Sequence, residues 1–70
     1  MQGPPRAGVR AAIARQLALE FDGVLPPAAV EAMVEEAAAE LHGQVPPGSL
    51  DEMVHRLAGY RLRETAEAGR

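Results

Sequence analysis

The sequence predicts an all-α fold, a small three-helix bundle, on the basis of three observations. Fourteen of the 70 residues are Ala, the residue that favours helices most strongly. No stretch alternates apolar and polar residues with the Val, Ile and Thr content of a strand. Three Pro-Pro pairs, at 4–5, 26–27 and 46–47, divide the chain, and proline suits the first turn of a helix. Each pair therefore marks the start of one helix.

The first helix is expected over residues 8–22, after a flexible N-terminal segment at residues 1–7. An apolar residue recurs every four positions, which places one stripe on the core side of this helix: Val9, Ile13, Leu17 and Phe21. Gly23 should end the helix, because glycine readily adopts the left-handed backbone conformation found just after helix C-termini.

The second helix is expected over residues 27–42. Its apolar positions follow helical spacing and predict the buried face: Val30, Met33, Val34, Ala37, Ala38 and Leu41. Four glutamates lie mostly on the opposite face: Glu31, Glu35, Glu36 and Glu40. Paired carboxylates perform acid–base chemistry only in a sequestered site, so this face is interpreted as solvated. Arginines of the same chain or of a partner would offset the repulsion between these carboxylates.

The third helix is expected over residues 50–64, followed by a frayed tail at residues 65–70. Ser49 and Glu52 match a capping box, in which a serine N-cap is followed three residues later by a glutamate. The apolar positions of this helix define one face: Leu50, Met53, Val54, Leu57 and Ala58.

The second and third helices begin with similar segments. Residues 26–34 align with residues 46–54 at an offset of 20 residues, and both prolines, a Met and a Val are identical. A single copy does not make a repeat array. Two helices under the same packing demand explain the similarity.

The charge of the chain is sorted by segment. The net charge is −3. The arginines lie in the first and third segments, whereas the second segment carries the four glutamates of its helix. An acidic balance argues against strong binding to polyanions. No apolar run approaches the roughly 20 residues of a membrane span, and the first residues have no apolar signal core. We therefore expect a soluble, cytoplasmic protein that does not bind membranes.

No residue pattern indicates catalysis, a cofactor or a metal. Asp51 and His55 have ligand spacing on one helix face, but a metal site needs at least a third ligand. The segment Gly48-Ser49 with the following Leu faintly resembles the phosphopantetheine attachment motif of acyl carrier proteins, although Gly replaces its Asp and helix capping already explains the serine. The absence of Cys excludes disulfides and thiolate metal sites. We expect no enzymatic activity.

A chain of this length buries only a marginal core, so its extra stability is expected to come from self-association as a homodimer. Another helical protein is a further possible partner. Leftover apolar surface and sorted charge suggest the interface residues: Leu19, Leu25, Leu57, Tyr60 and Leu62, with Glu35 or Glu40 set against Arg10 or Arg61. The alternative is a small DNA-binding regulator that uses the arginines of the third helix, Arg56, Arg61 and Arg63, although the acidic second helix makes nucleic acid an improbable partner.

The order of these residues resembles a family of three-helix-bundle dimerisation domains from actinobacteria. These domains occur alone or at the N-terminus of arsenate reductases related to low-molecular-weight tyrosine phosphatases. The resemblance rests on residues spread over the three helices: Leu17, Phe21, Gly23, Val24, Val30, Glu31, Val34, Ala58, Arg61 and Leu62. It implies a helical dimerisation module. Thiol-based reductase chemistry is excluded from this chain because it has no Cys.

Overall fold

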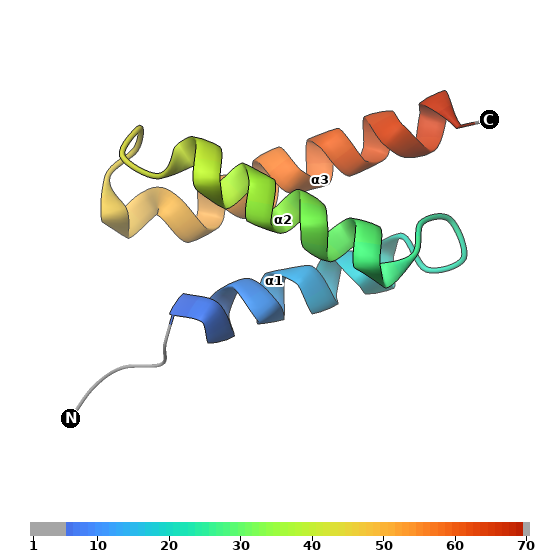
Figure 1. The fold of residues 1–70 in the computed structure, drawn as a ribbon, viewed down its shortest axis with the longest axis horizontal. Helices are drawn as coiled ribbons and strands as arrows, with labels where there is room; N and C mark the ends of the chain where they lie inside the picture. The colour runs from blue at the N-terminus through green and yellow to red at the C-terminus, as the bar shows by residue number, and fades with distance from the viewer. Residues whose placement is uncertain (1–5, 70) are drawn as a thin grey trace.

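The computed structural model describes residues 6–69, which form three α-helices and one short 3₁₀ turn. The elements are α1 (Arg6–Glu20), α2 (Pro27–Leu41), η1 (Pro47–Ser49) and α3 (Leu50–Ala68). Consecutive helices run in opposite directions (Figure 1), and these residues contain no strand. The predicted small all-α three-helix bundle is therefore confirmed.

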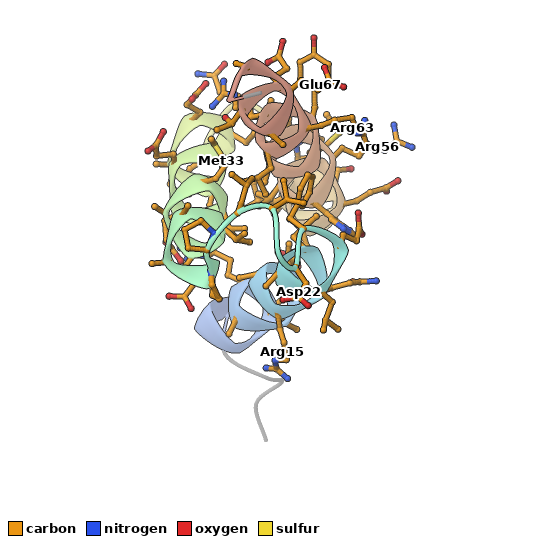
Figure 2. The ribbon with its side chains drawn as sticks, turned by 90° about the vertical axis from the view of Figure 1, so that its right-hand side faces the viewer. Arg15, Asp22, Met33, Arg56, Arg63 and Glu67 are labelled. Carbon is orange, nitrogen blue, oxygen red and sulfur yellow. The ribbon has the colours of Figure 1, made fainter. Side chains whose placement is uncertain are left out.

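Helix α2 holds the bundle together. It packs against both α1 and α3, whereas α1 and α3 touch each other over a smaller area. Viewed from its right-hand side, the bundle is a triangle of helices whose side chains meet in the middle (Figure 2). Buried residues on α2 recur at helical spacing, so one continuous face of this helix serves both neighbours.

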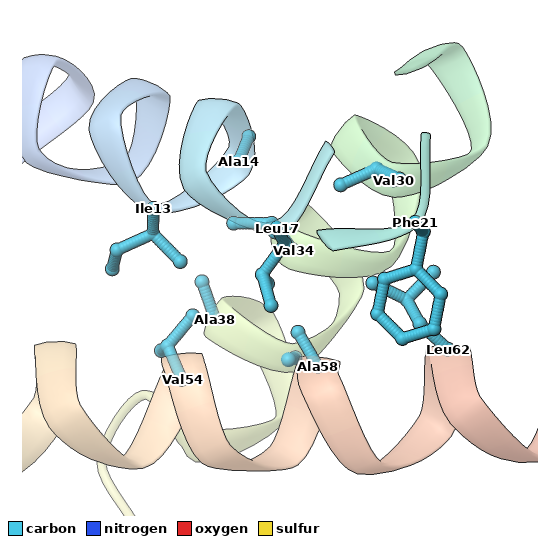
Figure 3. Close-up of a cluster of buried hydrophobic side chains, with 11 residues drawn as sticks. Ile13, Ala14, Leu17, Phe21, Val30, Val34, Ala38, Val54, Ala58 and Leu62 are labelled. Carbon is cyan, nitrogen blue, oxygen red and sulfur yellow. The ribbon is translucent and has the colours of Figure 1, made fainter. Parts of the chain in front are cut away.

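The core is apolar and built largely from small side chains (Figure 3). Its largest fully buried side chains come from all three helices: Leu17, Val30, Val34, Val54 and Leu62. Ala37 and Ala58 are both 0% exposed, so α2 and α3 bring alanines to positions without solvent access. Phe21 and Leu62 lie together at one end of the cluster. No polar or charged side chain is buried among the described residues, so burial incurs no polar desolvation cost there.

The two connections between helices have the same backbone form. Gly23 and Gly43 have φ angles of +79° and +80°, as predicted for Gly23. The Val24 N–H donates to the Phe21 carbonyl at 2.9 Å, and the Gln44 N–H donates to the Leu41 carbonyl at 2.8 Å. A Pro-Pro pair follows each turn. The similarity between residues 26–34 and 46–54 therefore extends back to the glycine turns that precede these segments.

The helix boundaries differ from the predicted ones at four places, of which the smallest is the end of α2 at Leu41 rather than residue 42. α1 ends at Glu20 rather than residue 22, because the Asp22 N–H bonds to the Leu19 carbonyl and the chain then enters the turn. α1 also begins at Arg6, inside the segment predicted to be flexible; the rest of that segment, residues 1–5, lies outside the described residues. α3 continues to Ala68, where fraying was expected from residue 65, and the partly buried Ala66 packs this last part against the core.

The predicted capping box at Ser49 is wrong. The Ser49 side chain makes no capping hydrogen bond, and its backbone (φ −104°, ψ −4°) lacks the extended conformation of an N-cap residue. The turn η1 takes over this role, because the Ser49 N–H donates to the Pro46 carbonyl at 2.9 Å and the Leu50 N–H donates to the Pro47 carbonyl.

Replacing Gly59 with Ala should stabilise the fold. Gly59 is buried in the interior of α3, and a Cβ added there would meet only the Leu17 side chain, at an ordinary contact distance of 3.6 Å. Gly59→Ala therefore gains helix propensity without a clash, and the free energy of unfolding should rise by about 0.5–1 kcal/mol. Urea denaturation followed by circular dichroism measures this change.

Gly23→Ala is the matched control. No atom lies within 4 Å of a Cβ at Gly23, so the only cost is the left-handed backbone, about 1–2 kcal/mol for a residue with a Cβ. Stability should fall. A loss of stability in Gly59→Ala instead would mean that α1 and α3 pack too tightly at Leu17 to admit a methyl group.

Candidate interaction surface

Two ion pairs connect α2 to its neighbours. The Arg10 Nη1 of α1 donates to the Glu35 Oε1 of α2 at 2.8 Å. On the other side of α2, both terminal nitrogens of Arg61 bind the two carboxylate oxygens of Glu40, with 2.8 Å between Nη2 and Oε1. The prediction set Glu35 or Glu40 against Arg10 or Arg61 across a dimer interface, whereas both ion pairs here are made within one chain. These four side chains hold the helices together and are not free to make the same bonds to a partner.

The bidentate contact between Arg61 and Glu40 changes the titration of both groups. Hydrogen bonding to Arg61 and its positive charge lower the pKa of Glu40, against a smaller opposing effect of burial. The same hydrogen bonds raise the pKa of Arg61, with further electrostatic contributions from Glu36 and Glu64. Glu40 is thus the carboxylate that contacts Arg61, and Glu36 and Glu64 act on its charge without an ion pair to it.

The structure divides the predicted apolar interface residues into three groups. Leu62 is 1% exposed and belongs to the core, so its assignment to the interface is corrected: it leaves no surface for a partner. Leu25 and Leu57 are partly buried against the core. Leu19 and Tyr60 are 74% and 58% exposed. Leu19 stands about 200° around α1 from the buried Leu17, and so faces away from the bundle.

A second apolar stripe runs along α3, beside its core face. It consists of Leu50, Met53, Leu57 and Tyr60, with spacings of three, four and three residues, and is called the α3 stripe below. Met53 is 37% exposed and Tyr60 is 58% exposed, while Leu50 and Leu57 are half-buried at its inner edge. This spacing is that of a helix–helix seam, and the core face of α3 is separate: Val54, Ala58 and Leu62.

Sequence reasoning missed Met53 as a surface residue, because it placed Met53 on the same face of α3 as the core residues Val54 and Ala58. The signal was present in the spacing. Two sets of apolar residues run along this helix, one at steps of four from Val54 and one with alternating steps of three and four from Leu50. A single core-facing stripe accounts for the first set alone.

The described residues also border two open grooves. The larger, of about 650 Å³, lies where the end of α2, η1 and the start of α3 meet, and its polar edge includes His42 and Asp51. The smaller, of about 480 Å³, runs between α1 and α2. Within the described part of the chain no three His, Asp or Glu side chains gather in a way that could hold a metal ion. Neither groove contains a fully buried polar side chain that would orient a ligand.

Comparisons with family models, curated proteins and solved structures give no match for this chain. None of the helices, over the residues described, is long and apolar enough to cross a membrane. The candidate surface therefore rests on the geometry of the described residues alone.

Acid should weaken the fold partly through Glu40. Its pKa in the folded chain lies below the ordinary value of a glutamate, so its contribution to stability is present above the unfolded pKa and is lost as the pH falls through the folded pKa. Glu40→Gln should therefore lose less stability than the natural chain between neutral pH and acid. Thermal unfolding over that range tests this.

The control for this experiment is Glu31→Gln, because Glu31 lies on the same helix and forms no ion pair among the described residues. The control should keep the acid sensitivity of the natural chain. If Glu40→Gln lost as much stability in acid as the natural chain, the contact between Glu40 and Arg61 would not be a source of pH-dependent stability.

Proposed function

We propose that this protein is a non-enzymatic self-association module that forms a dimer through the α3 stripe. The observation that carries the proposal is the second apolar stripe of α3, in which Leu50 and Leu57 pack partly against the core while Met53 and Tyr60 are 37% and 58% exposed. Single exposed apolar residues are ordinary, but a row of them at helix-seam spacing is typical of a surface that another helix covers.

A second copy of the chain is a suitable occupant of this stripe. In a two-fold dimer the same patch is used by both subunits, so the stripe must complement itself, and an apolar row along a straight helix does so. Full burial of a large apolar side chain contributes about 1.5–3 kcal/mol. Met53 and Tyr60 from both copies are partly exposed and would supply some of this gain, against an association cost of about 4–15 kcal/mol. The gain is close to the lower end of this cost, so a weak dimer that forms at high protein concentration is the expected result.

The arginines of α3 give less support to duplex DNA binding, the alternative class. Arg61 is held by Glu40, and Arg56 lies 3.5 Å from Glu52. The acidic side of α2 adjoins the same surface, where it would repel phosphates. A phosphate-binding face needs several free cations on one side of the molecule.

Tyr60→Arg should convert the dimer to a monomer. The side chain is largely exposed, so the bundle itself should remain folded, while the new charge would lie at one end of the apolar stripe and would be desolvated on association. Light scattering on a sizing column across a concentration series should give about twice the 7.4 kDa chain mass for the natural protein and the single-chain mass for the variant.

Leu19→Arg is the matched control, because Leu19 is even more exposed and lies on the outer face of α1. It should leave the mass unchanged. Leu57 is a less suitable position, because it also packs against the core and a charge there would unfold the chain as well. A natural protein that stays monomeric at all concentrations would overturn the proposal.

A further inference from the structure

Met53 is the sulfur-containing residue of the α3 stripe, and it is 37% exposed. It lies between Leu50 and Leu57 along the helix, three residues after the first and four before the second. Because the chain has no Cys, methionine thioethers are the only sulfur groups that an oxidant can meet. Oxidation at Met53 would therefore act directly on the surface proposed for self-association.

The other methionine among the described residues has a different place. Met33 lies on α2, is half-buried and packs against the core of the bundle. Figure 2 shows it on α2, which is not the helix that carries the stripe. Met1 lies outside the described residues. Within the described part of the chain, Met53 is thus the thioether that belongs to the α3 stripe.

Oxidation turns a methionine thioether into a sulfoxide, so that a flexible apolar side chain becomes a polar one. In a single chain the exposed position of Met53 lets water donate hydrogen bonds to the new oxygen. In a dimer the neighbours on the stripe, Leu50 and Leu57, offer no side-chain donor. The hydroxyl of Tyr60 is the one donor of the stripe, and it is attached about 10 Å further along α3. The sulfoxide oxygen would be covered without a partner, which disfavours the dimer.

We propose that Met53 is an oxidation site that controls self-association: its thioether permits the dimer, and its sulfoxide keeps the chain single. The inference rests on the proposed self-association through the α3 stripe. It adds the residue through which that surface is regulated and the class of co-reactant, the two-electron oxidants, of which hydrogen peroxide is a simple example.

The chemical step is an oxygen transfer. A lone pair of the Met53 sulfur attacks one oxygen of hydrogen peroxide, and the O–O bond breaks as the S–O bond forms. The proton on the transferred oxygen passes to the departing hydroxide, which leaves as water. The sulfur is oxidised by two electrons and the peroxide is reduced by two. Methionine sulfoxide reductases reverse the change, with one enzyme for each sulfoxide epimer.

Two-fold symmetry doubles the effect, because each dimer contains two copies of Met53. One polar group covered without a partner weakens association by about tenfold, and two such groups weaken it by about 100-fold. The unoxidised dimer is already weak, so a shift of this size moves its dissociation constant above the concentrations at which the dimer forms.

The bundle itself should tolerate the sulfoxide. The core face of α3 is formed by the buried Val54, Ala58 and Leu62, and Met53 is not part of the core cluster. In a single chain the sulfoxide oxygen therefore lies in water. Because the helix content should stay constant, circular dichroism separates a change in association from unfolding.

Peroxide treatment followed by light scattering tests the site. At a concentration where the natural chain has about twice its 7.4 kDa mass, complete oxidation should return the single-chain mass with unchanged helix content. Met53→Leu, an apolar replacement of similar volume, should dimerise and keep its mass after the same treatment. Met33→Leu is the matched control, because it retains Met53 and should lose the dimer as the natural chain does. Treatment of the oxidised natural chain with both reductases should restore the dimer.

Each result of this experiment has a separate meaning. A dimer that survives full oxidation of Met53, verified by peptide mass mapping, overturns the inference and leaves self-association in place. A Met53→Leu dimer that dissociates in peroxide also overturns it, since another residue would then be the sensitive one. A natural chain that is monomeric before any oxidant is added removes the proposed function, and the inference with it.

Protection of Met53 by the dimer gives a second test. With peroxide in excess, the oxidation rate of Met53 should fall as the protein concentration rises through the dimer dissociation constant, because the interface covers the sulfur. The rate at Met33, which packs against the core of its own chain, should not change. If Met53 reacted at an unchanged rate in a solution that light scattering shows to be dimeric, it would lie outside the interface and could not control association.

Discussion

The bundle depends on the close approach of α2 to its two neighbours. The chain has only one aromatic residue in its core, Phe21, and much of the buried surface of α2 belongs to alanines. Small side chains gain little from burial individually, so the helices must come near to one another to exclude water. Ala37 and Ala58, both without solvent access, mark where this happens. A core of this kind is complete but thin, and it uses only one face of α3.

Electrostatics follows from the same central position of α2. Its glutamates form ion pairs with arginines on both sides, Arg10 on α1 and Arg61 on α3. Each neighbouring helix is therefore joined to α2 by an ion pair as well as by the apolar core. Arg61 satisfies only part of the negative charge around it. The apolar α3 stripe lies beside this pair of Arg61 and Glu40, since Leu57 and Arg61 are about one helical turn apart on α3.

The fold was predictable from the sequence to a large extent, and the candidate surface only in part. Apolar spacing identified core residues such as Leu17 and Val34, because a helix face is read from its period, and the positive φ of Gly23 followed from its place after a helix. Leu62 was misplaced, since spacing alone cannot say which of two apolar stripes faces inward. Ser49 does not cap α3, because it belongs to the 3₁₀ turn η1 and therefore lacks the extended backbone conformation on which capping depends. Sorted charge predicted Glu35 or Glu40 against Arg10 or Arg61 between two chains, but which residues pair, and that they pair within one chain, required the structure.

The repeated turns have a consequence for how such a chain can grow. Gly23 and Gly43, twenty residues apart, both have positive φ angles, and a Pro-Pro pair follows each of them. α2 begins directly at Pro27, whereas η1 lies between Pro46 and α3, so the two connections share their glycine and prolines but not the way in which the next helix starts. Such a chain could gain a helix by duplication of one 20-residue segment, and a few residues inserted in either turn would only lengthen that loop.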